Sequence, residues 1–288
     1  MQPILLSLIT YLPLAGALVA FLCPGASQER DRAARWLGLW TTLVTLGLSV
    51  LLWVGFDPTQ PGLQYETRLG WLGEYGITYH TGVDGISLVF VLLTAFLTPL
   101  SLLAGWRSVQ TQGRDFVAML LMLETALFGL FSAQDLVLFY VFYEATLIPG
   151  SLMIGVWGGQ KRVWASLQFF LFTFAGSLFM LVGLITMWLK TGTTDIPTLM
   201  QTGFSQPLQG WLLLAFVLAF GVKLPLFPLH AWLPDAYTEA PTPATAMMSG
   251  VLSKTGAYGL LRFGVLMFPD AARIFAPYIL ALGVAAIL

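Results

Sequence analysis

Two glutamates and two lysines lie inside stretches of sequence that are otherwise apolar. Glu124, Glu144, Lys223 and Lys254 each fall within a mostly apolar run of about 20 residues, the length that a helix needs to cross a bilayer. A charge at mid-membrane costs at least about 2.5–3.5 kcal/mol, so such residues usually mark ion pathways. Burial favours the neutral form of a lysine, whereas an arginine stays charged. These residue types therefore predict a proton relay.

The four charged residues share one depth. With a rise of about 1.5 Å per residue, Glu124 and Glu144 lie about 12 and about 14 Å into their spans. Lys254 and Lys223 lie at about 17 and about 18 Å on the same scale. All four positions are near the middle of an apolar core about 30 Å thick, which predicts a lateral row across four helices. A set of static ion pairs between helices is the alternative.

The segment that contains Lys223 predicts a broken helix. Residues 221–230 read GVKLPLFPLH. Pro225 and Pro228 each remove a backbone donor, so we expect the carbonyl of Gly221 and a second carbonyl to be released near the lysine. Broken helices at membrane depth line protein or water and mark binding sites in transporters, although a simple proline kink is the alternative.

Two further features lie close to these segments. Pro149 removes the donor that would bond the carbonyl of Ala145, beside Glu144. His230 follows the broken segment, where it could shuttle protons or bond a free carbonyl. We therefore include His230 among the relay candidates.

Four other ionisable residues have plainer interpretations. We expect Asp84 and Asp135 to cap helices. Arg262 is expected to pair with an acid or to extend to the interface. His80 falls in a predicted loop and is expected to be solvated.

Composition limits the chemistry further. Hydrophobic residues make up 57% and charged residues 9% of the chain, and the mean hydropathy is +0.81, whereas soluble domains are about 25% charged. Cys23 is the single cysteine, which excludes an intrachain disulfide or a cysteine-ligated Fe–S cluster. With two histidines and no Gly-rich phosphate motif, we expect no metal, cofactor or redox centre on this chain.

Apolar runs predict an all-α, polytopic transmembrane bundle of about nine spans. They lie near 3–22, 36–56, 85–106, 116–133, 135–156, 164–189, 209–231, 243–268 and 272–288. Odd-numbered connections hold seven Lys and Arg against three in the even ones, which places the N-terminus outside. Tryptophans near span ends, Trp232 among them, predict an interfacial belt. The last run reaches Leu288 without a polar tail, so we expect a partial chain.

Three strings carry a family resemblance. Residues 120–150 (LLMLETALFGLFSAQDLVLFYVFYEATLIPG), 223–244 (KLPLFPLHAWLPDAYTEAPTPA) and 252–263 (LSKTGAYGLLRF) closely resemble the antiporter-like subunits of proton-pumping NADH:quinone oxidoreductase, respiratory complex I. VDGISLVFVLLT at 83–94 fits as well. The form FYxFYEATLIP around Glu144 is similar to chain M rather than to chain L, chain N or the Mrp-type antiporter subunits.

The resemblance implies a fold and roles for particular residues. Glu124 and Glu144 match the fourth- and fifth-helix glutamates, Lys223 the broken seventh-helix lysine and Lys254 the eighth-helix lysine. The family has two inverted five-helix repeats. Residues 1–106 would then form helices 1–3 with an external loop, 107–268 the first repeat (helices 4–8), and 269–288 the truncated start of the second. Tyr237 departs from the family's usual histidine, which weakens any relay role for its loop.

The resemblance also implies a function. The chain would relay protons through an ion pair of Glu144 and Lys223 that opens and closes, driven by quinone reduction elsewhere in the complex. FMN, Fe–S clusters and quinone would lie on partner subunits of a multi-pass inner-membrane assembly, with no nucleic acid involved. A Mrp-type cation/proton antiporter subunit, a hydrogenase-linked pump and a purely structural membrane subunit are the alternatives.

Overall fold

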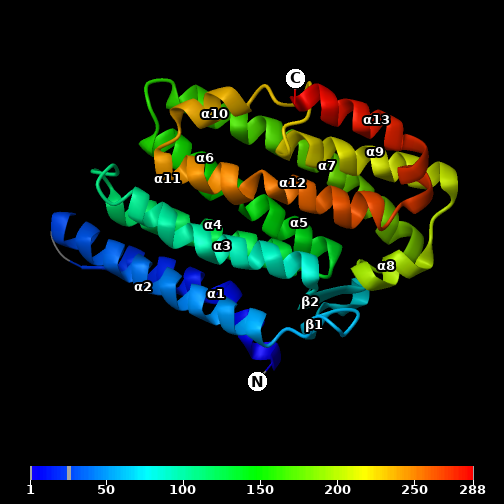
Figure 1. Cartoon of the computed structure of the whole chain (residues 1–288), viewed down its shortest axis with the longest axis horizontal. Helices are drawn as coiled ribbons and strands as arrows, with labels where there is room; N and C mark the ends of the chain where they lie inside the picture. The colour runs from blue at the N-terminus through cyan, green and yellow to red at the C-terminus, as the bar shows by residue number, and fades with distance from the viewer. Residues whose placement is uncertain (1, 25–26, 288) are drawn as a thin grey trace.

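Long helices run side by side in a computed structural model, which describes residues 2–24 and 27–287 (Figure 1). The elements are α1 (Gln2–Leu22), α2 (Ser27–Val54), β1 (Gln64–Leu72), η1 (Gly73–Tyr75), β2 (Ile77–Val83), α3 (Gly85–Ala104), α4 (Gly113–Ser132), α5 (Leu136–Ala145), α6 (Leu147–Trp157), α7 (Arg162–Thr191), α8 (Ile196–Thr202), α9 (Gln206–Lys223), α10 (Leu233–Glu239), α11 (Thr242–Met247), η2 (Met248–Leu252), α12 (Lys254–Gly259), η3 (Leu260–Val265) and α13 (Pro269–Ile287). Helices satisfy every backbone donor within one segment, which the apolar bilayer requires.

Seven helical segments among the described residues are long and apolar enough to cross a membrane. They are α1, α2, α3, α4, α5 with α6, α7 and α9. The predicted all-α class and transmembrane bundle are confirmed. The eighth predicted span consists of α11, η2, α12 and η3, in which two π-helical segments interrupt the α-helix, and α13 occupies the ninth.

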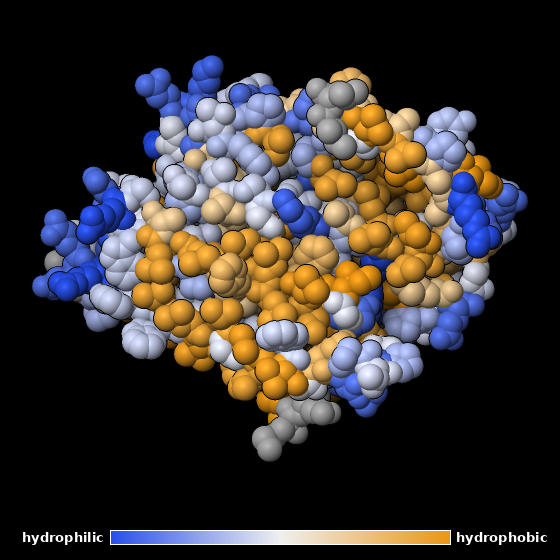
Figure 2. Space-filling view, viewed as in Figure 1, coloured by the Kyte–Doolittle hydropathy of each residue, from blue (hydrophilic) through white to orange (hydrophobic). Residues whose placement is uncertain are grey.

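The faces of the bundle differ in burial and polarity. In the most apolar 18-residue stretch of α4, 83% is buried inside the protein, whereas the corresponding stretch of α2 is 33% buried. Helix α4 is therefore central and α2 peripheral. Figure 2 shows a broad hydrophobic band across the middle of the molecule, with hydrophilic side chains gathered toward its two ends. An apolar band between polar ends, as this face shows, is typical of the surface of a multi-pass membrane protein.

A β-hairpin replaces part of the long loop expected between the second and third spans. Strands β1 and β2 pair antiparallel, with Arg68 opposite His80. Gly76 ends the connecting turn with a φ of 66°, a left-handed conformation that glycine adopts without strain. The hairpin packs near α8 at one end of the bundle (Figure 1).

His80 on this hairpin is buried, so its predicted solvation is wrong. Its Nδ1 lies 2.7 Å from the Asp195 carboxylate and its Nε2 lies 2.9 Å from that of Glu66. The hairpin folds over the start of α8, where Asp195 is the N-cap and accepts from the backbone N–H of Thr198. Burial by itself raises the pKa of Asp195, but bonds from His80 and Thr198 outweigh it and hold the pKa at about 2.

Two spans are interrupted, and both interruptions lie beside predicted relay residues. Helix α5 ends at Ala145 and α6 begins at Leu147, with one residue, Thr146, between them. Helix α9 ends at Lys223 itself, and helical structure resumes only at Leu233 in α10. The broken seventh helix predicted from the sequence is therefore confirmed.

Candidate proton-relay site

Lys223 is a buried ammonium group with neutral neighbours in contact. Its side chain is only 1% exposed, at the last residue of α9. Nζ donates to Thr146 Oγ1 at 2.7 Å and lies 4.2 Å from the centre of the Tyr143 ring. Among the described residues, Lys223 makes no ion pair within 4.0 Å. Neither the hydroxyl nor the π face carries a formal charge, so these two contacts would stabilise a protonated Lys223 without neutralising it.

The break between α5 and α6 is what brings Thr146 to the lysine. Pro149 has no N–H for the carbonyl of Ala145, so the helix cannot continue regularly through this turn. The Thr146 hydroxyl donates to the Tyr143 carbonyl at 2.7 Å, which leaves its oxygen lone pairs free to accept from Lys223. Neither Thr146 nor Tyr143 was predicted as a site residue, although both flank Glu144 in the sequence.

The backbone carbonyls just before the break at Lys223 find hydrogen-bond donors that the sequence did not predict. The Gly221 carbonyl was expected to be free beside Pro225, but it accepts from Leu226 N at 2.8 Å in a wider turn. The Val222 carbonyl accepts from Trp232 Nε1 at 2.9 Å. Trp232 is only 2% exposed, so its predicted place in the interfacial belt is wrong. This indole instead ties the returning chain to the broken end of α9.

Helix α12 packs against the same break through a glycine. A Cβ on Gly256 would lie 2.6 Å from the Phe220 carbonyl oxygen and 2.8 Å from Leu224 N, both backbone atoms. Backbone atoms cannot move aside as the end of a flexible side chain can, so only glycine fits at this position. The two backbones are consequently in direct contact next to Lys223.

Glu144 lies close to Lys223 without touching it, because its neighbour in the chain, Tyr143, has its ring 4.2 Å from Nζ. No oxygen of the Glu144 carboxylate lies within 4.0 Å of Lys223 Nζ. Its Oε1 is buried and bonds none of the described residues. The predicted ion pair is therefore open in this structure.

Glu124 is isolated from that group. It is fully buried on α4, and neither carboxylate oxygen has a hydrogen-bond partner in the described part of the chain. Thr98 of α3 lies near it, but the Thr98 hydroxyl donates to the Thr94 carbonyl. No contact joins Glu124 to Lys223 within residues 2–24 and 27–287.

Lys254 and His230 also lie apart from Lys223. Lys254 is exposed on the surface of this chain, and its Nζ donates to the Ser249 carbonyl at 2.5 Å in the π-helical segment η2. The expectation of a buried lysine is thus not met here. His230 stacks on Phe227 with ring centres 5.6 Å apart, and its buried Nδ1 has no partner among the described residues.

The plainer interpretations of three charged residues are confirmed. Asp84 caps α3 in a reciprocal capping box with Ser87. Arg262 pairs with Asp84 and also donates to Gln134 at 2.6 Å. Asp135 caps α5 by accepting from the first backbone N–H groups of the helix.

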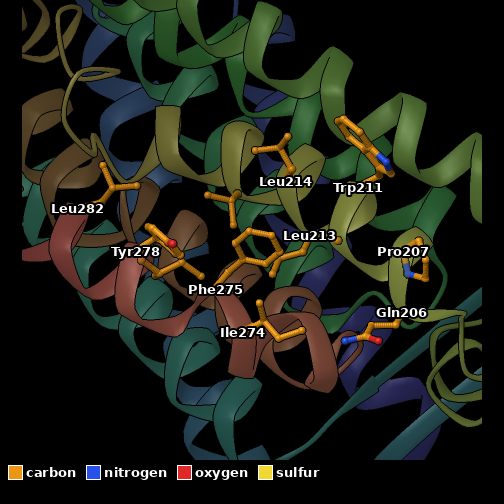
Figure 3. A pocket seen from close by; sticks show the side chains of 12 residues that line it. Gln206, Pro207, Trp211, Leu213, Leu214, Ile274, Phe275, Tyr278 and Leu282 are labelled. Atoms are coloured by element: carbon orange, nitrogen blue, oxygen red, sulfur yellow. The ribbon is translucent and has the colours of Figure 1, made fainter.

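A large groove between α9 and α13 is distinct from this site. It encloses about 520 Å³ and is lined mainly by apolar side chains, among them Trp211, Leu214 and Phe275 (Figure 3). None of its lining residues is a carboxylate, lysine or histidine. No group of three or more His, Cys, Asp or Glu that could hold a metal occurs in the part of the chain that the structure describes.

Comparisons with known proteins agree on the family. Residues 133–288 match the family model described as NADH:quinone oxidoreductase/Mrp antiporter, TM, and residues 35–129 match the amino terminus of NADH-ubiquinone oxidoreductase chain 4. NADH-quinone oxidoreductase subunit M of Rhodobacter capsulatus is 45% identical over 98% of this chain and 57% of its own length. NADH-ubiquinone oxidoreductase chain 4 of Marchantia polymorpha is 42% identical over 98% of this chain and 57% of its own length.

A solved structure has the same fold. The structure of respiratory complex I from Thermus thermophilus with bound NADH contains a chain that is 32% identical, with a TM-score of 0.84, over 96% of this chain and 56% of that one. The chain therefore spans less than two thirds of the length of these relatives. The resemblance to chain M is confirmed, and the chain belongs to the NADH:quinone oxidoreductase/Mrp antiporter transmembrane family.

Proposed function

We propose that this chain is a proton-translocating membrane subunit of NADH:quinone oxidoreductase. The observation that carries the proposal is the environment of Lys223, which is 1% exposed at the end of a broken helix. Its Nζ bonds the Thr146 hydroxyl and faces the Tyr143 ring, and no carboxylate of the described residues lies within 4.0 Å. A static ion pair would require a carboxylate in contact with it. A lysine whose charge is stabilised from a distance is suited to change its protonation state.

Glu144 is the group that would control this change. While the pair is open, the Thr146 hydroxyl and the Tyr143 ring are the groups in the described part of the chain that offset the cost of burying a charge on Lys223. Closing the pair to about 4 Å at an effective dielectric constant of about 20 would stabilise the ammonium by about 4 kcal/mol. Movement of Glu144 toward or away from Lys223 would therefore load or release the proton.

Lys254 would receive the released proton. It lies two residues before Gly256, whose backbone contacts the break that follows Lys223. Because Lys254 is exposed on this chain, it would pass the proton to a group outside the described residues. Glu124 and His230, each with a buried atom that lacks a partner in the described structure, would supply the input side.

We also propose a setting for the relay, which the relatives' names support as far as a membrane subunit of NADH:quinone oxidoreductase. Other membrane subunits of the complex would flank this chain, and FMN, Fe–S clusters and quinone on partner subunits would supply the driving force. The chain would lie in the bacterial inner membrane with its N-terminus outside. Helices 4–8 would form the first of two inverted repeats, with the boundaries 107–268.

Replacement of Glu144 tests the proposal. In the assembled complex, Glu144→Gln removes the controlling charge, so coupled NADH:quinone turnover and proton pumping should fall together. Glu74→Gln is the matched control, because Glu74 is exposed in η1 outside the spans. Full pumping by an assembled Glu144→Gln complex would show that Glu144 does not control the relay.

A cation/proton antiporter subunit is the second candidate, because the matching family model is described by both activities. The two functions differ in the ion that drives transport. Sodium-dependent proton movement in vesicles without NADH would favour the antiporter, and NADH-driven pumping independent of sodium would favour the oxidoreductase subunit.

A further inference from the structure

A polar cavity lies at the end of the bundle where α2 begins. It encloses about 630 Å³ and is formed by the first turns of α2 and by the connection between α3 and α4. Its lining residues are Gln28, Asp31, Arg32, Arg35, Trp36, Trp106, Arg107 and Gln110. Three arginines and one aspartate give it a formal charge of +2. Cavities of about 300–1,000 Å³ are of the size that holds a small ligand.

Two of the cavity's charged residues already serve the fold. Arg35 donates to the carbonyls of Trp106 at 2.9 Å and Val109 at 2.6 Å, which fixes the connection between α3 and α4. The carboxylate of Asp31 accepts from the backbone N–H groups at the start of α4, at 2.9 and 3.0 Å. The hydrogen bonds of the aspartate thus go to the start of α4, and its negative charge is already included in the cavity's formal charge of +2.

The other two arginines have no such role. Arg32 and Arg107 are exposed, and neither forms a side-chain hydrogen bond or ion pair with any residue in 2–24 or 27–287. Both line the cavity, Arg32 from α2 and Arg107 from the connection between α3 and α4. A guanidinium group presents a planar pair of donors that matches two oxygens of a phosphate.

The depth of the cavity indicates the ligand. Trp36 and Trp106 pack edge to face, with ring centres 5.2 Å apart, along its side. Tryptophans concentrate at the level of lipid headgroups, where one side of the ring is apolar and the other wet. In Figure 2 the hydrophilic end over the start of α2 borders the hydrophobic band. The cavity therefore lies at the boundary between headgroups and acyl chains.

We infer that this cavity binds the headgroup of an anionic phospholipid, with its phosphate between Arg32 and Arg107. The N-terminus of α2 adds a positive end of the helix dipole on the same side. The acyl chains would extend along the apolar surface beyond Trp36. An acidic side chain of a partner subunit is the competing occupant, but it would not require a cavity at the level of the lipid headgroups.

The test measures lipid retained by the purified complex. The complex is washed in detergent, incubated with phosphatidylglycerol or phosphatidylcholine, and its bound lipid is quantified by mass spectrometry. Each arginine near an anionic headgroup contributes about fivefold in affinity, equivalent to about 1 kcal/mol. The double variant Arg32→Gln, Arg107→Gln should thus bind phosphatidylglycerol about 25-fold more weakly.

Matched variants separate this site from general charge effects. Lys161→Gln with Arg162→Gln removes two charges at the same end of the bundle, one from the connection between α6 and α7 and one from the first residue of α7 (Figure 1). This control should bind phosphatidylglycerol as the unmodified complex does. Arg32→Lys with Arg107→Lys keeps the charge and should retain most of the binding. Where the double variant does not assemble, Arg107→Gln alone should show about a fivefold loss.

Three outcomes would overturn the inference. Undiminished phosphatidylglycerol in the double glutamine variant would show that the arginines do not hold the headgroup. Equal retention of phosphatidylcholine would show that the site does not select an anionic lipid. Loss of a neighbouring subunit with unchanged bound lipid would identify an acidic protein partner instead.

Discussion

Replacing Thr146 with valine should impair the relay without changing the packing around Lys223. Valine is close in volume to threonine but cannot accept from Lys223, whose Nζ bonds the Thr146 hydroxyl at 2.7 Å. That hydroxyl is the only hydrogen-bond acceptor for Nζ among the described residues. The variant therefore leaves a buried ammonium with only the Tyr143 ring in contact.

The cost can be worked from the structure. A hydrogen bond to a charged group contributes about 1.5–3 kcal/mol, and the loss is largest where burial excludes water. Lys223 is 1% exposed, so water cannot replace the lost acceptor without a change in packing. About 2 kcal/mol corresponds to about 30-fold in the equilibrium between charged and neutral lysine. We expect coupled turnover to fall by about tenfold or more.

The assay compares coupled NADH:quinone turnover and proton pumping in membranes that contain equal amounts of assembled complex. Thr146→Ser is the matched control, because serine keeps both the bond to Lys223 and the donation to the Tyr143 carbonyl, which is 2.7 Å long. The serine variant should keep at least half of the activity. Wild-type turnover and pumping by Thr146→Val would refute the view that this hydroxyl stabilises the relay lysine.

Three further predictions concern the surroundings of the site. Gly256→Ala places a Cβ 2.6 Å from the Phe220 carbonyl oxygen and should lower the free energy of unfolding by about 1–3 kcal/mol, which is measured as a lower melting temperature of the complex. Gly47→Ala, whose Cβ would have no atom within 4 Å, should leave the melting temperature unchanged. Equal melting temperatures for the two variants would contradict the close packing at Gly256. The pKa of Asp195 is lowered to about 2, so the ionised carboxylate stabilises the fold by about 2 kcal/mol above about pH 4, and this contribution is lost as the pH falls toward 2. Thermal unfolding of the solubilised protein as a function of pH should show the loss. Asp195→Asn should remove this pH dependence. Tyr143→Phe keeps an aromatic ring 4.2 Å from Nζ and should retain pumping, whereas Tyr143→Leu removes the ring and should reduce pumping severalfold. Greater loss of pumping in Tyr143→Phe than in Tyr143→Leu would show that the hydroxyl matters and the ring does not.

Much of the fold could be predicted from the sequence, because the bilayer imposes a simple rule. Apolar runs of about 20 residues must be helical, so the spans were predictable one by one. Proline chemistry predicted the broken helix at Pro225 and, at Pro149, the loss of the donor for the Ala145 carbonyl. The caps at Asp84 and Asp135 followed from their positions just before apolar runs.

What the sequence could not supply were contacts between distant segments. His80 was expected in solvent because nothing local reveals that Asp195, far along the chain, closes over it. Thr146 lies two residues after Glu144, yet its role depends on the end of α9 lying opposite it. The same is true of Trp232, which resembles an interfacial residue until the chain folds back to the Val222 carbonyl.

The most direct test of the central claim is the variant Lys223→Arg in the assembled complex. Arginine keeps the positive charge but cannot release its proton near neutral pH, so a static charge would survive the change and a relay would not. NADH-driven proton pumping is measured beside the unmodified complex, with assembly checked on native gels and Glu144→Gln as a second variant. The relay predicts an assembled complex that does not pump through this subunit. Pumping at the unmodified rate by Lys223→Arg would contradict it.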